Sequence, residues 1–133
     1  MTQLELGDQL VREDGKLADA RSLVMIQCVG CRDAEHSYCA RICCSTAVKN
    51  ALKLKEIKPG MDIFILFRDM RTYGFAEDYY REAAEKDVKF IRWGPEDKPQ
   101  VETATAGGKQ VLRITVPDPI LGEKLALDTD WVV

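Results

Sequence analysis

Five cysteines lie within seventeen residues of this chain, and none lies elsewhere in its 133 residues. They are Cys28, Cys31, Cys39, Cys43 and Cys44. An odd number of thiols cannot close into a full disulfide framework, and a bridge between the neighbours Cys43 and Cys44 would strain the geometry of the bond. Thiolates gathered this closely usually bind a soft metal or carry out redox chemistry. The cysteines therefore predict a metal or redox site.

The overall composition is that of an ordinary globular domain, with 46% hydrophobic and 31% charged residues. A chain of 133 residues is long enough for one domain with its own core. The net charge of −3 argues against nucleic acid as the main partner. No apolar run is long enough to insert into a membrane, and the N-terminal sequence MTQLELGDQLVRED lacks the apolar segment of a secretory signal. We therefore expect a cytoplasmic protein whose thiols stay reduced.

Strand and helix patterns alternate through the first two thirds of the chain, since short apolar runs predict buried strands and segments of helical periodicity predict helices. The predicted strands are 22–30, 61–67 and 88–93, and the predicted helices are 37–58 and 75–86. This order predicts βαβ units around a parallel sheet. Residues 1–21 are polar and poorly periodic, so we predict a flexible lead-in segment before one domain over 22–133. We expect Lys53, Lys55 and Lys58 to form a solvated face near the end of the first helix.

The last third of the chain changes to short alternating strands. These are predicted at 101–106, 111–116 and 124–127, with turns at 107–108 and 117–122, and they are typical of an antiparallel meander. Residues 131–133 begin another apolar strand, as expected of a chain cut from a longer protein. We predict a Rossmann-like three-layer α/β domain with a parallel sheet and a small antiparallel β-meander, of the thioredoxin-reductase nucleotide-domain type.

The phosphate-binding fingerprint of such nucleotide domains is missing. The first strand should be followed by G-x-G-x-x-G, whose glycines let the backbone approach a pyrophosphate, whereas residues 28–33 read CVGCRD. Asp69, at the end of the second strand, is a weak match for the acidic residue that binds a ribose. We therefore predict a cysteine site in place of the nucleotide site, and no NAD(P) binding.

The cysteine residues alone leave the chemistry of this site open. Four thiolates suit either a [4Fe-4S] cluster or a tetrahedral zinc ion, and Cys28 with Cys31 forms a CxxC motif that could act as a redox dithiol. On a helix, Cys44 would point about 100° away from the face shared by Cys39 and Cys43. The thiols can therefore converge only if Cys39 lies at the helix start and Cys28 approaches from the strand.

Four further side chains near the cysteines have both a functional and a plain interpretation. His36 could ligate a metal, but we expect a solvated loop histidine. Arg68, Arg71 and Tyr73 follow the second strand, at the edge where ligands bind in such sheets. They could clamp an anion or dock a partner, or they could form a solvated turn.

The C-x10-C-x3-C-C spacing of Cys28, Cys39, Cys43 and Cys44 is unusual, and it comes with distinctive flanking sequence. The flanking segments are IQCVGCRD, YCARICCSTAVKNALKLKE, ILFRDMRTYGF and YYREAAEKDVKFIRWGPEDKP. With these segments, residues 25–102 closely resemble the A subunit of heterodisulfide reductase and its relatives in sulfate reducers. The resemblance implies an anaerobe and a flavoprotein parent with a thioredoxin-reductase-type core, ferredoxin-like modules and several iron–sulfur clusters.

The resemblance also implies a site. It implies a [4Fe-4S] cluster in place of NAD(P)H, with Cys28, Cys39, Cys43 and Cys44 as its ligands. Where the family has serine, this chain has Cys31, which would be a spare thiol or a substitute ligand. FAD is implied only for the full-length parent, and the implied partners are the remaining domains or subunits of that complex.

We therefore expect an electron-transfer module of a heterodisulfide reductase-like flavoprotein complex. It would be part of an oxidoreductase, without activity as an isolated fragment. The alternatives are a structural zinc-binding interaction domain and a CxxC dithiol oxidoreductase.

Overall fold

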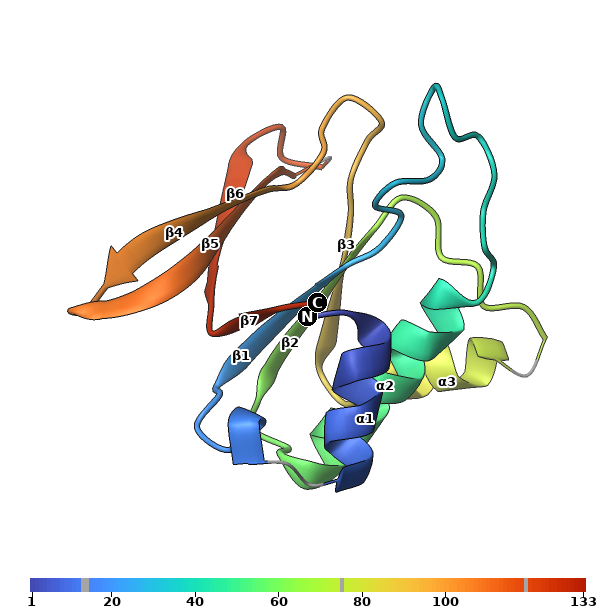
Figure 1. The fold of residues 1–133 in the computed structure, drawn as a ribbon. Coiled ribbons are helices and arrows are strands. Elements are labelled where there is room, and N and C mark those ends of the chain that lie inside the picture. The colour runs from blue at the N-terminus through green and yellow to red at the C-terminus, as the bar shows by residue number, and fades with distance from the viewer. Residues whose placement is uncertain (13–14, 75, 119) are drawn as a thin grey trace.

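The computed structural model describes residues 1–12, 15–74, 76–118 and 120–133. Its first sheet is parallel, in the order β3-β2-β1-β7, and its second is antiparallel, in the order β4-β5-β6 (Figure 1). The parallel strands are β1 (Ser22–Ile26), β2 (Asp62–Phe67), β3 (Val88–Arg92) and β7 (Trp131–Val132). The antiparallel strands are β4 (Gln100–Ala106), β5 (Lys109–Pro117) and β6 (Lys124–Thr129). The helices are α1 (Gln3–Arg12), α2 (Cys43–Ile57) and α3 (Ala76–Glu85), with a short 3₁₀ turn at Gly15–Leu17. None of the helices in the described ranges is both long and apolar enough to cross a membrane.

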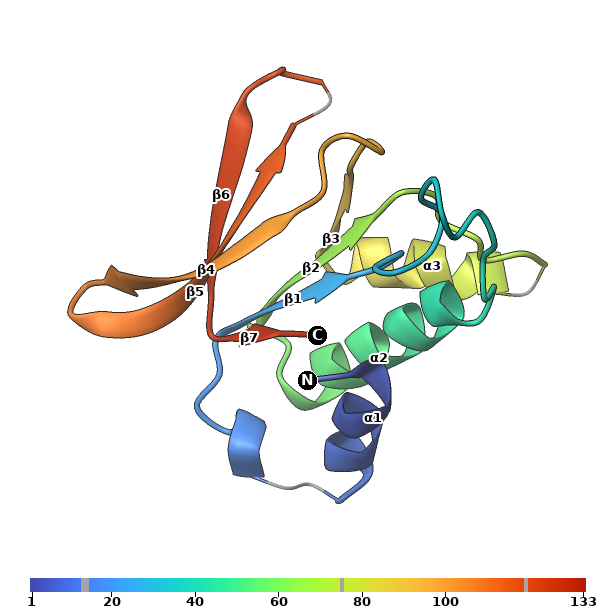
Figure 2. The same ribbon diagram turned by 45° about the horizontal axis from the view of Figure 1, so that its top comes forward.

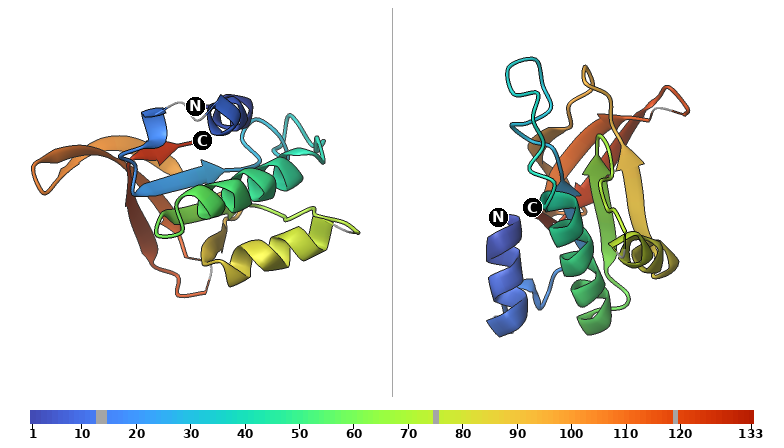
Figure 3. Two further views of the ribbon diagram at one scale, coloured as in Figure 1. Left: turned by 90° about the horizontal axis from the view of Figure 1, so that it is seen from below. Right: turned by 90° about the vertical axis from the view of Figure 1, so that its right-hand side faces the viewer.

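The elements form three layers, because both faces of the parallel sheet are covered (Figures 2 and 3). On β1, Leu23 and Met25 belong to the core shared with the helices. Val24, which points to the opposite face, belongs to a second core with Ile114 and Val116 of β5. This alternation follows from the two-residue period of a strand. The predicted three-layer α/β class, with a parallel sheet and an antiparallel meander, is therefore confirmed.

Two predicted element boundaries are wrong near the cysteines. The strand predicted over 22–30 ends at Ile26, and the helix predicted from residue 37 begins at Cys43. Cys28 and Arg41 have φ values of 67° and 63°, in the left-handed region that neither a strand nor a right-handed helix can include. Residues 27–42 therefore form one long irregular connection. Phe75, the predicted start of the next helix, and Pro119, within the predicted loop 117–122, lie outside the described residues.

The lead-in segment predicted over 1–21 instead contains α1. The helix starts with a reciprocal cap in which the Thr2 hydroxyl accepts from the Glu5 N–H at 3.2 Å, and the Glu5 carboxylate accepts from the Thr2 N–H at 2.6 Å. Leu6 and Leu10, one helical turn apart, are buried in the core against α2. Apolar side chains spaced by four residues therefore dock this segment onto the domain.

Two of the three lysines predicted to form a solvated face of α2 are tied to backbone carbonyls instead. The Lys55 side chain is buried, and its ammonium donates to the carbonyl oxygen of Met61 at 2.7 Å. The Lys58 ammonium donates to the carbonyl oxygens of residues 17, 18 and 20 at distances of 2.9, 2.5 and 2.7 Å. Both cations lie at the negative end of the helix dipole. Lys58 thereby fastens the 3₁₀ turn and its connection to the end of α2.

The docking of α1 can be tested with two leucines of the same helix. Leu6 is fully buried and Leu4 is 80% exposed. We expect Leu6→Ala to lower the free energy of unfolding by about 2–5 kcal/mol, because it leaves a cavity in the core. Leu4→Ala, the matched control, should change it by less than about 0.5 kcal/mol. Urea unfolding followed by circular dichroism measures both, and equal effects would contradict the observed orientation of α1.

Candidate metal centre

The cysteine-rich connection lies at the carboxyl edge of the parallel sheet. Residues 27–42 leave β1 and residues 68–74 leave β2 at the same edge, where the two connections run close together (Figure 1). The strands are parallel neighbours, with Ile26 opposite Leu66, and the Gln27 N–H donates to the Leu66 carbonyl at 2.8 Å. In open α/β sheets this is the edge where ligands bind.

The five cysteines come from both ends and the middle of this connection. Cys28 is buried directly after β1, Cys31 and Cys39 are half-buried in the irregular part, and Cys43 and Cys44 form the first turn of α2. Cys39 precedes the helix, and its sulfur accepts the Arg41 N–H at 3.4 Å. All five thiols are free. Cys39 therefore lies in the irregular connection, four residues before α2, and not at the helix start that the prediction from the sequence required.

The thiols are close enough to influence one another electrostatically. Burial raises the pKa of Cys31, and the neighbouring thiols of Cys28, Cys43 and Cys39 raise it further, against the opposing charge of Arg32. Burial also raises the pKa of Cys44 to about 11, with Cys43 and Cys28 adding to the rise. The five cysteines therefore form one neighbourhood, in which the thiolates of Cys31 and Cys44 are disfavoured unless a positive charge or a metal compensates them.

The start of α2 offers one compensating charge. No side chain caps the helix at Ile42, and its first turn contains no acidic residue. The N–H groups of the first turn therefore lack a side-chain acceptor, and the positive end of the helix dipole lies at Cys43 and Cys44. An anionic group beside these thiols would be stabilised there.

Asp69 joins the cysteine connection to the end of β2. Its carboxylate forms ion pairs with Arg32, in the cysteine connection, and with Arg92, at 3.1 Å, from β3. Its backbone carbonyl accepts the Cys44 thiol at 3.7 Å. The carboxylate of Asp69, the weak match to a ribose-binding residue, is therefore engaged by two guanidinium groups. Nothing in the sequence near Arg32 identified this contact, because Asp69 lies 37 positions further along the chain.

The residues at this edge fit an anionic iron–sulfur cluster by their chemistry. Thiols are the ligands that such clusters use. At this edge, the buried N–H donors Arg32 Nη1 and Trp93 Nε1 have no hydrogen-bond partner among the described residues. Trp93 belongs to the same apolar cluster as Cys28, and Cys31 packs against that cluster. Buried donors of this kind normally have an acceptor, and a cluster sulfur can serve as one.

The thiols do not have the geometry of a metal-bound set. Within ranges 1–12, 15–74, 76–118 and 120–133, no three His, Cys, Asp or Glu side chains are arranged to hold one metal ion. The structure thus brings the predicted ligands to one edge of the sheet without making them converge on a point.

The other predicted side chains divide between solvent and packing. His36 is exposed, contacts the Asp33 carboxylate at 3.3 Å and lies edge-on to Tyr38. The Arg68 guanidinium stacks over the ring of Trp93, 5.5 Å from its centroid, and Tyr73 is exposed. The solvated interpretation therefore holds for His36, while Arg68 packs on an aromatic ring.

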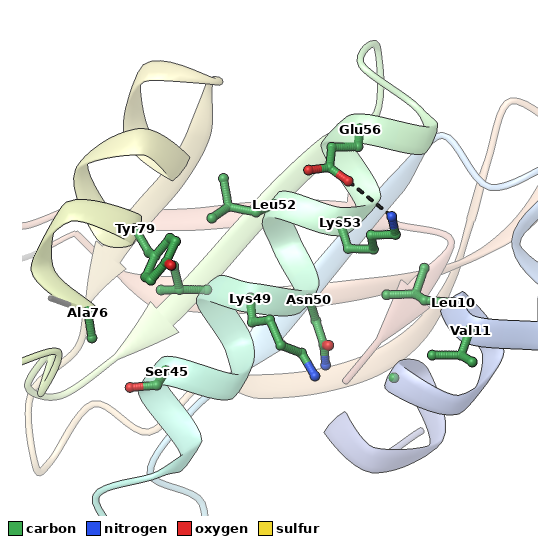
Figure 4. Close-up of a pocket in the computed structure, with 12 residues that line it drawn as sticks. Leu10, Val11, Ser45, Lys49, Asn50, Leu52, Lys53, Glu56, Ala76 and Tyr79 are labelled. Atoms are coloured by element: carbon green, nitrogen blue, oxygen red, sulfur yellow. Dashed lines mark hydrogen bonds and ion pairs between the residues drawn. The ribbon is translucent and has the colours of Figure 1, made fainter.

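A cavity of about 760 Å³ lies on the helical face, over α2 and between α1 and α3 (Figure 4). Leu10 and Val11 line one side, Tyr79 the other, and Lys49 and Lys53 extend from α2 between them. The described lining contains none of the five cysteines. The cavity is therefore separate from the cysteine edge.

Comparison with known proteins gives sequence relatives over nearly the whole chain, although no family model matches it. The chain is 38% identical to the iron-sulfur A subunit of the CoB–CoM heterodisulfide reductase of Methanocaldococcus jannaschii. It is 36% identical to the A subunit of the H2/formate:CoB-CoM heterodisulfide,ferredoxin reductase of Methanococcus maripaludis. Each match covers 96% of this chain and 19% of the relative. The chain belongs to the family of heterodisulfide reductase A subunits. It spans about a fifth of the length of these curated relatives.

The fold has a solved counterpart. The crystal structure of thioredoxin reductase from T. acidophilum matches 96% of this chain and 33% of its own, with a TM-score of 0.51 and 15% identity. The predicted family resemblance and the predicted thioredoxin-reductase type of fold are thus both confirmed.

The contrast between two adjacent thiols gives a test of the site's geometry. Cys44 is buried, with a pKa of about 11, so about one such thiol in a thousand is ionised at pH 8, whereas Cys43 is half-buried. In the metal-free protein we expect iodoacetamide to alkylate Cys43 well before Cys44. The Cys44 rate should rise about tenfold per pH unit between pH 8 and 10, as the thiolate fraction grows. Tandem mass spectrometry of the labelled peptide separates the two positions, and equal rates at pH 8 would contradict the buried position of Cys44.

Proposed function

We propose that this domain is an electron-transfer module that binds a [4Fe-4S] cluster through Cys28, Cys39, Cys43 and Cys44. It would pass single electrons within a heterodisulfide reductase-like flavoprotein complex. The observation that carries the proposal is the gathering of five free thiols on one connection and the helix turn that follows it, at the ligand-binding edge of the sheet. The M. jannaschii relative is named as an iron-sulfur subunit, which supports this metal chemistry.

Three features of the chain suit the binding of such a cluster. The uncapped start of α2 and the guanidinium of Arg32 supply positive charge to an anionic group. The apolar cluster around Cys28, with Trp93 and Leu66, limits the access of water from the side of the meander. A cluster in such a setting exchanges one electron at a time, and its potential is set by charge, hydrogen bonds to sulfur and solvent exposure.

The partners in this proposal are the remaining domains or subunits of the complex, since the chain spans 19% of its relatives. FAD, in this proposal, belongs to the parent protein. The alternative dithiol chemistry would use Cys28 and Cys31, but the helix that lowers a thiol pKa in a thioredoxin-like site begins close to its CxxC motif. Here α2 begins at Cys43, twelve residues after Cys31.

Replacing each cysteine in turn tests the ligand assignment. After anaerobic reconstitution we expect about four irons per chain and a brown protein. Serine at position 28, 39, 43 or 44 should abolish or convert the cluster, whereas Cys31→Ser, the matched control from the same connection, should retain it. Iron and sulfide analysis with absorbance spectra measure the outcome. Loss of the cluster in Cys31→Ser, with retention in Cys28→Ser, would overturn the assignment. A colourless protein with one zinc would favour the structural zinc domain.

Pyridine nucleotides provide a second test. Cys28 occupies the first position of the expected glycine fingerprint, and the Asp69 carboxylate is engaged by Arg32 and Arg92. We expect calorimetric titration with NADH or NADPH to give no binding in the low micromolar range, because neither the pyrophosphate nor the ribose has its usual partner. A dissociation constant of a few micromolar would contradict the proposed replacement of the nucleotide site.

A further inference from the structure

Arg32 directly follows Cys31, and only part of its guanidinium has a partner. Nη2 is ion-paired with the Asp69 carboxylate. Nη1 is buried and has no hydrogen-bond partner among the described residues. A buried N–H of a charged group is costly to leave without an acceptor. Arg32 Nη1 therefore needs a hydrogen-bond acceptor, at a position in the chain directly after Cys31.

Asp69 holds this guanidinium at the cysteine edge. The second oxygen of its carboxylate binds Arg92 at 3.1 Å, and Arg92 Nε donates to the Arg68 carbonyl at 2.9 Å. The Asp69 carbonyl also accepts the Cys44 thiol. The Arg32 side chain is therefore fixed between the end of β2 and the start of α2, and only 20% of it is exposed.

The acceptor that best suits a buried guanidinium N–H is anionic. Arg32 directly follows Cys31, and its partner Asp69 also accepts the Cys44 thiol, so the guanidinium lies at the cysteine edge. An iron–sulfur cluster carries negative charge on its sulfurs, and these sulfurs accept N–H hydrogen bonds.

We propose that Arg32 Nη1 donates a hydrogen bond to a sulfur of the cluster bound at this edge, and that Arg32 thereby raises the reduction potential of the cluster. This inference rests on the proposed function. One-electron reduction takes the cluster from [4Fe-4S]²⁺ to [4Fe-4S]⁺ and makes its sulfurs more negative. A fixed guanidinium stabilises the reduced state more than the oxidised state. Arg32 is in this sense a positioning and tuning residue, and the cysteines alone are the ligands.

Three variants of the 133-residue chain separate this role from a general effect of charge. Arg32→Met removes both the charge and the donors at nearly constant length, and Arg32→Lys keeps the charge without the planar fork. Arg41→Met is the matched control, because Arg41 belongs to the same connection and its side chain is exposed. Each protein is reconstituted anaerobically, and its fold and iron content are checked by circular dichroism and metal analysis. The midpoint potential is then measured by redox titration followed by electron paramagnetic resonance.

We expect Arg32→Met to retain the cluster and to be harder to reduce. The ratio of reduced to oxidised cluster at a fixed potential should fall about tenfold, which is about 59 mV for a one-electron couple. Arg32→Lys should shift the potential in the same direction by less, and Arg41→Met by much less than either. With ¹⁵N-labelled arginine, pulsed resonance of the reduced wild-type cluster should show a nitrogen coupling that disappears in Arg32→Met and persists in Arg41→Met.

The outcomes separate this inference from the function on which it rests. If wild-type protein takes up no iron, the proposed function fails, whatever Arg32 does. If the cluster forms but Arg32→Met leaves its potential unchanged, or Arg41→Met shifts it equally, only the role of Arg32 is overturned. If neither Arg32 variant takes up iron while both remain folded, Arg32 serves cluster assembly, and the tuning role is wrong.

Discussion

Burial of the parallel sheet on both faces is the constraint on which the rest of this structure depends. Leu23 and Met25 of β1 pack under the helices, and Val24 packs against the meander, so β1 is held from two sides. A shift of one residue would exchange these two cores, and the register is therefore strongly specified. Because β1 and β2 are parallel neighbours, their carboxyl ends leave the sheet at one edge. The cysteine connection and the connection after β2 are brought together by this geometry.

The contact across that edge is electrostatic. A single carboxylate, that of Asp69, receives Arg32 from one connection and Arg92 from β3, and its own carbonyl receives the Cys44 thiol. In dinucleotide-binding domains, an acidic residue in the corresponding region holds a ribose. The chain thus shares its fold with thioredoxin reductase, while at the carboxyl edge of its own sheet the Asp69 carboxylate binds two guanidinium groups. A shared fold therefore does not determine the chemistry of the site.

The strands of the parallel sheet could be predicted from the sequence, but the conformation of the cysteine connection, residues 27–42, could not. Apolar runs and helical periodicity identified every strand of the parallel sheet, since buried strands carry a strong local signal. Helix α1 was missed, although Thr2 and Glu5 form a capping box that precedes an apolar pattern and could have revealed it. The late start of α2 at Cys43 follows from left-handed backbone conformations in the preceding connection. Such conformations can be predicted from sequence at glycine, but not at other residues. The spacing of the cysteines identified the thiols as a group. The ion pair of Arg32 with Asp69 joins positions that are distant in the sequence, so it could be recognised only from the folded structure.

At position 28 the backbone is left-handed, so the residue that would be best for stability differs from the residue that supplies a thiol. Its φ of 67° is a conformation that glycine adopts freely and that disfavours a side chain by on the order of 1 kcal/mol. Glycine is also the residue that nucleotide-binding relatives of this fold use in the turn after the first strand. A redesign of this chain that optimised stability alone would therefore select glycine at this position. It would gain a more relaxed turn and lose the buried thiol nearest the sheet.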